Sequence, residues 1–287
     1  MKNTFAILVV LIICISCTKQ VEINLQNSQP KYGIDCLFSP DDPMELYVFK
    51  TSSINNNTFH FIDGFEVELF ENDSLLWSGS NSEAGKYSIP VQPETDKEYK
   101  IIAKNDEAVL LMANDFVPLK VNIVSATYLF PVYEDMYGSK FGKVALSFND
   151  IPGIKNYYEI VILSKDSSVN YTFNINSFVI NLDNENDPNP PGSILFTDEL
   201  FDGKKLDLNI FVCTYNEPII VLRSVSRNYY EYRKSITAHF YNQNSQRNDV
   251  YNLFKGDPLE LYSNVANGLG IFAAFSQDVK VCSKIDN

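Results

Sequence analysis

The sequence FEVELF at residues 65–70 decides the fold class of this chain. Apolar and acidic residues alternate along it, and a period of two is typical of a strand with one buried face. Residues 71–73 (END) follow as a turn. The segment LLWS at residues 75–78 then returns as a second strand, which carries the only tryptophan, Trp77. The stretch therefore predicts a β-hairpin.

Similar strand patterns flank this hairpin. The pattern predicts strands at residues 32–38, 44–49, 85–89 and 98–103, with turn-forming residues between them. Short strands every 8–12 residues are typical of a β-sandwich. We therefore expect residues 31–116 to form an N-terminal β-sandwich, which resembles immunoglobulin-like or carboxypeptidase-regulatory-like modules.

Residues 117–287 form a second predicted region, which begins next to Pro118. Alternating segments predict a second β-rich domain, either a sandwich or barrel-like. Residues 224–241 differ, because apolar and aromatic residues recur there at spacings of three and four, as in an amphipathic helix. Ser224 or Ser226 is expected to cap its N-terminus. The stripe predicts Tyr229 and Tyr232 in the core and Tyr230 on another face.

Residues 1–16 predict a signal peptide. The uncharged apolar run at residues 5–15 is too short to cross a bilayer, and it follows the basic residue Lys2. Ser16 then precedes Cys17, an order that resembles the lipobox of bacterial lipoproteins, although Cys14 stands where leucine is usual. We predict that Cys17 is acylated and that residues 17–30 tether the body to a membrane. An ordinary secretory peptide is the alternative.

Composition and charge exclude several classes of protein. The chain has 287 residues, 45% hydrophobic and 21% charged, which argues against general disorder. Its formal net charge is −13, and nucleic acids are bound by clustered lysine and arginine. We therefore expect neither a nucleic-acid partner nor a polybasic membrane surface. After the first 16 residues we expect no membrane-spanning helix.

Three cysteines remain after Cys17. They are Cys36, Cys213 and Cys282, an odd number that allows at most one disulfide. Cys213 and Cys282 are expected to be buried small apolar residues, with a Cys213–Cys282 disulfide as the alternative. No CxxC pair is present, so we predict no structural zinc and no cofactor.

Few residues suggest chemistry. His60 and His239 are the only histidines, and the sequence contains no HExxH, GxSxG or phosphate-binding loop. The acidic, proline-rich stretch at residues 181–192 leaves a calcium site open, with a solvated loop as the simpler interpretation. Adjacent acids such as Asp41-Asp42 and Glu134-Asp135 leave a carboxylate-dependent hydrolase open.

The C-terminal segment at residues 258–276, PLELYSNVANGLGIFAAFS, resembles a Bacteroidota lipoprotein family known as domain of unknown function 4249. The segments at residues 224–232, 156–158, 196–199 and 36–40 are also similar to it. The seven signature residues that we single out are expected to be structural, because they fit a turn followed by a closing strand. They are Tyr262, Ser263, Asn264, Asn267, Gly268, Gly270 and Phe272.

The resemblance implies an outer-membrane lipoprotein, on either the periplasmic or the surface face, that works beside a TonB-dependent receptor. We predict a non-catalytic accessory protein that contacts the membrane through the lipid on Cys17 and binds a small-molecule, glycan or peptide ligand. The alternatives are a structural or assembly factor of the envelope and a carboxylate-dependent envelope hydrolase.

Overall fold

The computed structural model describes residues 30–52, 60–80, 84–163, 174–175, 193–243 and 259–285. Within these ranges the fold is mainly β with one helix near the C-terminus, as predicted. Cys17, the signal peptide and the acidic stretch at residues 181–192 lie outside these ranges. Among the described residues, no helix is both long and apolar enough to cross a membrane.

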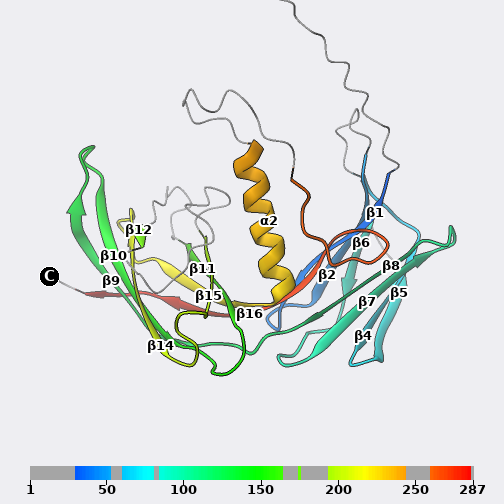
Figure 1. Cartoon of the computed structure of the whole chain (residues 1–287), viewed down its shortest axis with the longest axis horizontal. Helices are drawn as coiled ribbons and strands as arrows, with labels where there is room; N and C mark the ends of the chain where they lie inside the picture. The colour runs from blue at the N-terminus through cyan, green and yellow to red at the C-terminus, as the bar shows by residue number, and fades with distance from the viewer. Residues whose placement is uncertain are drawn as a thin grey trace, which may run out of the picture.

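The central sheet has eight strands and runs through the whole molecule (Figure 1). Its order is β13-β11-β15-β16-β1-β2-β3, and β6 also pairs with β2. The strands are β1 (Tyr32–Phe38), β2 (Met44–Lys50), β3 (His60–Phe61), β6 (Lys86–Ile89), β11 (Tyr157–Leu163), β13 (Ser193–Thr197), β15 (Ile219–Val225) and β16 (Leu269–Val281).

Two smaller sheets pack against this central sheet. The first, in the order β5-β4-β7-β8, contains β4 (Phe65–Glu71), β5 (Ser74–Ser80), β7 (Glu98–Asn105) and β8 (Leu110–Phe116). The second, in the order β12-β14-β10-β9-β17, contains β9 (Ile123–Glu134), β10 (Lys140–Asn149), β12 (Asn174–Ile175), β14 (Lys205–Val212) and β17 (Ser283–Ile285).

Each small sheet encloses its own apolar core. In the first lobe, β1, β2, β6 and the start of β16 face β4, β7 and β8 across a core that includes Phe65 and Phe272. In the second lobe, β11, β13 and β15 face β9, β10 and β14 across a core that includes Phe148 and Tyr158. Fully burying such a side chain contributes about 1.5–3 kcal/mol.

Strand β16 joins the two predicted regions. It pairs in parallel with β1, from Gly33↔Leu269 to Phe38↔Ala274, and antiparallel with β15, from Ile219↔Val281 to Val225↔Phe275. The N-terminal strands at residues 32–50 therefore share one sheet with strands of the second region. The boundary near Pro118 marks the passage from β8 to β9 but does not separate the sheets.

Helix α2 (Arg227–Gln243) lies on the face of the central sheet that the small sheets leave open (Figure 1). Ser226 is its N-cap, because the Tyr229 amide donates to the Ser226 hydroxyl over 3.1 Å. Tyr229 and Tyr230 both pack on the sheet, so the predicted outward placement of Tyr230 is wrong. Adjacent helical residues lie only about 100° apart, and the sheet covers both.

The cysteines of the described chain carry free thiols. Cys36 and Cys282 are buried in the two cores, and Cys213 is half-buried. The alternative Cys213–Cys282 disulfide is therefore not formed. Burial raises the pKa of Cys282 to about 12, so this thiol is a poor nucleophile.

Candidate functional site

The signature residues lie where helix α2 meets strands β8 and β16. The side chain of Asn264 bonds to both backbone groups of Phe272: it accepts from the Phe272 amide over 3.0 Å and donates to the Phe272 carbonyl over 2.8 Å. The Tyr262 hydroxyl donates to Asn228 Oδ1 of α2 over 2.6 Å. The neighbouring Ser263 hydroxyl accepts from the Val265 amide over 3.3 Å. These contacts attach the segment before β16 to the helix and to the sheet.

The turn that starts β16 depends on its backbone conformation. Asn267 has a φ of 60° and donates to the Leu110 carbonyl over 3.1 Å. Gly270 has a φ of 104°, and a Cβ at this position would overlap the carbonyl oxygen of Ile34 in β1. A Cβ at Gly268 would meet the Tyr32 carbonyl at 2.8 Å. All the signature contacts described above are made within the fold.

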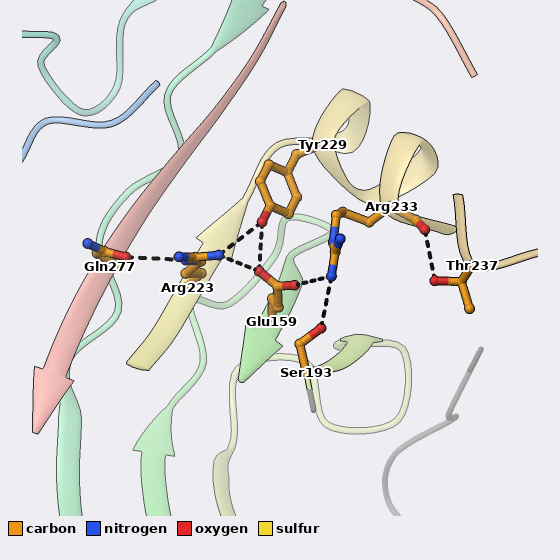
Figure 2. A network of polar contacts seen from close by, with 7 residues as sticks. All are labelled: Glu159, Ser193, Arg223, Tyr229, Arg233, Thr237 and Gln277. Carbon is orange, nitrogen blue, oxygen red and sulfur yellow. Dashed lines mark hydrogen bonds and ion pairs between the residues drawn. The ribbon is translucent and has the colours of Figure 1, made fainter. Parts of the chain in front are cut away.

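A buried polar network lies between α2 and the central sheet (Figure 2). Glu159 on β11 is 1% exposed, and its Oε2 accepts from Arg223 Nη1 over 2.9 Å and from the Tyr229 hydroxyl over 2.7 Å. Its other oxygen, Oε1, lies 3.3 Å from Arg233 Nη2. Arg223 extends the network across the sheet to Gln277 over 3.2 Å. The network therefore links β11, β15 and β16 to the helix.

The electrostatics of this network keep Glu159 ionised. Burial disfavours the charged carboxylate, but Arg223 and Arg233 outweigh this effect and lower the pKa of Glu159 below its ordinary value. Both carboxylate oxygens already have protein partners. A general acid or base works best with a pKa near the working pH, and the pKa of Glu159 is lowered away from that range. Its geometry suits holding the helix on the sheet.

Asp115 on β8 connects the first lobe to the start of α2. Its oxygens accept from the Asn228 side-chain amide over 2.9 Å and from the Ala274 backbone amide over 2.7 Å. Burial outweighs these hydrogen bonds and those from Ser226 and Phe116, and it raises the pKa of Asp115 to about 6. The carboxyl therefore titrates in the mildly acidic range while remaining enclosed by its donors.

Three carboxylates lie close together at one end of the second lobe. Asp150, Asp198 and Asp202 have oxygen atoms within 4.8 Å of one another. The Asn156 side-chain amide donates to Asp150 and to Asp198, each over 3.3 Å. The Gly203 amide donates to Asp150 over 2.7 Å. Burial and the neighbouring Asp150 raise the pKa of Asp198. Each of the three carboxylates therefore has at least one protein donor, since the Gly153 amide donates to Asp202 over 2.9 Å.

A groove of about 340 Å³ opens between the two lobes. Phe116 and Leu119, from the segment that leaves the first lobe, line one wall. Lys155 and Tyr157, at the start of β11, line the other. Ser224, at the end of β15, is also part of the lining. We call this feature the interlobe groove. Its volume falls within the range of about 300–1,000 Å³ that is typical of small-molecule sites.

Ser224 is the unusual residue of the interlobe groove. It is 5% exposed, and its hydroxyl has no hydrogen-bond partner in the described part of the chain. Arg223 and Val225, on either side of it in β15, face helix α2, so Ser224 points to the opposite face of the sheet. Its cross-strand neighbour Ser276 also has an unpartnered buried hydroxyl. Buried polar groups usually have partners, so a hydroxyl group without one is a place for a ligand to bond.

The structure separates the other residues that the sequence singled out. His60 lies on short β3, in the first lobe, and the ring of His239 contacts the Leu259 carbonyl over 2.8 Å. The two histidines therefore do not form a joint site. Glu134-Asp135 lies at the turn between β9 and β10, and Asp41-Asp42 forms an exposed turn before β2. Neither acidic pair lines the interlobe groove.

Sequence reasoning missed Glu159, Arg223 and Asp115. It considered Ser224 only as a helix N-cap, a role that Ser226 fills. The sequence around Glu159 could have indicated its role, because Glu159 is the one charged residue in the otherwise apolar strand YYEIVIL. A charge in such a strand predicts a buried partner. Arg223 interrupts the apolar run IIVLRSV in the same way. No local pattern marks Ser224 or Asp115.

These features define a mainly β protein with two lobes on one shared sheet. The chain belongs to a family described as "Domain of unknown function (DUF4249)", whose model matches residues 18–280. A comparison with curated proteins finds no match. An α-L-rhamnosidase from Dictyoglumus thermophilum is similar to 69% of this chain and over 27% of its own length, at 10% identity. The TM-score of 0.34 is too low to support any inference from that similarity.

Proposed function

We propose that this protein is a lipoprotein of the outer membrane, anchored through Cys17, that binds a small ligand in the interlobe groove as an accessory to a TonB-dependent transporter. The observation that carries the binding role is the buried, unpartnered hydroxyl of Ser224 in a groove whose walls include Phe116, Leu119 and Tyr157. This lining suits a largely apolar, neutral molecule with one hydrogen-bonding group. Binding, not catalysis, is proposed because Glu159 and Asp115 are enclosed by donors outside the groove, and Asp96 is the single acidic residue in its lining, without a second carboxylate to pair with it there.

The binding role is tested with the neutral fluorescent probe N-phenyl-1-naphthylamine, which has one N–H group. Wild-type protein should enhance its fluorescence saturably. Ser224→Ala removes the hydroxyl with little change in volume and should weaken binding about 3–10-fold, the effect expected for losing one hydrogen bond. Leu119→Arg should weaken it more than 10-fold, because it places a charge in the wall.

The matched control is Leu75→Arg, because Leu75 is also exposed and apolar but lies on β5, outside the interlobe groove. This variant should bind the probe like the wild type. Equal weakening by Leu75→Arg and Leu119→Arg would show that the probe reports general surface hydrophobicity, and it would refute the groove as the site.

The anchor is tested by the mass of the N-terminal peptide from native membranes. The mature peptide should begin at Cys17 and carry acyl chains. Cys17→Ala should abolish the acyl mass, whereas Cys14→Ala should retain it, because Cys14 lies in the part that is removed. An unmodified N-terminus elsewhere would refute the anchor.

The transporter partnership is tested by capture from native membranes in mild detergent. Wild-type protein should recover a TonB-dependent barrel. The acyl-deficient Cys17→Ala variant, produced in soluble form and added to the same membranes, should recover it if the protein body makes the contact. Absence of any barrel from both captures would refute the partnership and leave the ligand-binding role to its own test.

A carboxylate-dependent hydrolase is the second candidate. It is favoured by one observation, the raised pKa of Asp198 next to Asp150. An Asp198→Asn variant should then lose hydrolysis of envelope glycans that the wild type cleaves. If the wild type cleaves none of them, this candidate fails.

A further inference from the structure

The turn between β9 and β10 presents two large apolar side chains to solvent. Met136 is 89% exposed and Tyr137 is 85% exposed, which makes them the most exposed large hydrophobic residues of the described chain. The two lie side by side in sequence at the far end of a long hairpin. We call this pair the hairpin tip. Adjacent exposed residues of this kind mark a contact surface more often than isolated ones do.

The turn is held by its own hydrogen bonds. Asp135 Oδ1 accepts from the Tyr137 amide over 2.9 Å and from the Ser139 amide over 2.8 Å. The Asp135 amide donates to the Ser139 carbonyl over 3.0 Å, and Gly138 adopts a φ of 83° that closes the turn. The hairpin tip is therefore presented by an ordered backbone, which lowers the entropy cost of binding.

Aromatic packing stiffens the hairpin just below the tip. The rings of Tyr133 and Phe141 stack with their centroids 4.7 Å apart and their planes 2° apart. Phe211 of the neighbouring strand β14 packs edge-on against Tyr133 at 5.7 Å. These contacts come from three strands, so Met136 and Tyr137 project from a supported stem.

The hairpin tip points to the same side of the molecule as the start of β1. In Figure 1 the β9–β10 turn and the first residues of β1 both reach toward the upper edge, whereas the opposite ends of β9 and β10 lie below. The peptide from Cys17 to Pro30 can span at most about 45 Å, since an extended chain advances roughly 3.3–3.6 Å per residue. A lipid on Cys17 would therefore hold the start of β1 within about 45 Å of the bilayer, and the hairpin tip projects toward the same side of the molecule as the start of β1 (Figure 1).

The chemistry of the tip fits the interfacial layer of a bilayer. Tyrosine is enriched there because its ring is apolar and its hydroxyl is polar, and methionine is flexible and apolar. Glu134 and Asp135 flank the tip, and the chain has a formal net charge of −13. Anionic headgroups would repel it, so zwitterionic headgroups are the suitable surface.

We infer that Met136 and Tyr137 insert into the headgroup region of a zwitterionic bilayer and form a second membrane contact beside the lipid on Cys17. This inference rests on the proposed anchor. Two separated contacts fix the orientation of the body, whereas a single tether leaves it free to rotate. The interlobe groove would then hold a constant direction relative to the membrane.

The experiment places a single tryptophan at the tip of the full-length, acylated protein. In the tip variant, Tyr137→Trp is combined with Trp77→Phe, and the protein is reconstituted in phosphatidylcholine vesicles with brominated acyl chains. The control variant combines Leu200→Trp with Trp77→Phe. Leu200 is also exposed and lies outside the interlobe groove. It belongs to the connection from β13 to β14, and Lys205 at the end of that connection pairs with Asn149, at the end of β10 opposite the turn. The acyl mass and the circular dichroism of both variants are measured first.

We expect brominated lipid to quench the tryptophan of the tip variant at least twofold more than that of the control variant, together with a blue shift of the tip emission. The quenching should weaken when half of the lipid is phosphatidylglycerol, because of the acidic flank. Acylated, folded protein with equal quenching in both variants would overturn the inference while leaving the anchor intact. Quenching of the tip tryptophan that vanishes only when a co-reconstituted barrel is present would assign the tip to a protein partner and overturn the membrane contact. Absence of acyl mass would instead refute the proposed anchor.

Discussion

Replacing Glu159 by glutamine tests what holds helix α2 on the central sheet. The substitution keeps the shape of the side chain but leaves Arg223 and Arg233 without their buried counter-charge. Removing one partner of a buried ion pair costs about 3–5 kcal/mol. The side chains of Arg223 and Arg233 retain 27% and 16% exposure, so water recovers part of that cost. We therefore expect the free energy of unfolding to fall by about 2–4 kcal/mol.

The assay is urea denaturation at pH 7, monitored by circular dichroism. Glu199→Gln is the matched control, because Glu199 pairs with Lys155 at 2.5 Å while both side chains are more than half exposed. The denaturation midpoint of this control should not change measurably. If Glu159→Gln and Glu199→Gln have the same midpoint as the wild type, the network does not hold the helix and the reasoning fails.

The pH dependence of the Glu159→Gln effect follows from the lowered pKa of Glu159. The ordinary value is 4.5, and the folded protein holds it below that. A lowered pKa contributes stability that is present above 4.5 and is lost as the pH falls through the folded value. The stability difference between wild type and Glu159→Gln should therefore be largest above about pH 5 and shrink below pH 4.5. A difference that grows on acidification would contradict this assignment.

Three further predictions concern the junction of the two lobes. Gly270→Ala should destabilise the protein by about 3–5 kcal/mol in urea denaturation, because the new Cβ meets the Ile34 carbonyl and residue 270 has a positive φ. The control is Gly64→Ala. Gly64 also has a positive φ, 86°, but lies in open space, so this variant should lose only about 1–2 kcal/mol. The pKa of Asp115 rises from 3.8 to about 6, so its contribution to stability is full below about pH 4 and falls by about 3 kcal/mol as the pH rises past 6. Asp115→Asn should remove that pH dependence. If the free energies of unfolding of the wild type and of Asp115→Asn differ by the same amount from pH 4 to pH 7, the raised pKa of Asp115 does not control stability. Asn264→Ala should cost about 2–4 kcal/mol, because two buried backbone groups of β16 lose their partner; a loss below 0.5 kcal/mol would contradict this.

The sequence predicted those strands that have one buried and one exposed face. Strand β4 alternates because its acidic residues face away from the first core. Strands β13 and β15 were missed because the second core covers one of their faces and α2 the other, so SILFT and IIVLRSV carry no alternation. Strand β8 was missed for another reason: its inward positions include Ala113 and Asp115, which obscure the pattern.

The candidate site was harder to predict than the fold. Glu159 and Arg223 are 64 positions apart, and they meet only because β11 and β15 pair in the register that places them opposite each other. The interlobe groove combines residues from four separate segments. Two of them resemble the family, but nothing in their sequence indicates that the four segments meet. By contrast, the C-terminal signature could be recognised as one continuous stretch of sequence, because Asn264 bonds to Phe272 of β16, which is close to it in the chain.

The pairing of β1 with β16 has a consequence for biosynthesis. A ribosome completes residues 33–38 early, yet their strand partners at residues 269–274 follow 236 positions later. Until then the first half of the chain exposes an unpaired edge that invites aggregation. A chain that is threaded N-terminus first through an export channel benefits from this delay, because it cannot close its central sheet too early. A chaperone that covers the edge of β1 would then be needed until β16 pairs with it.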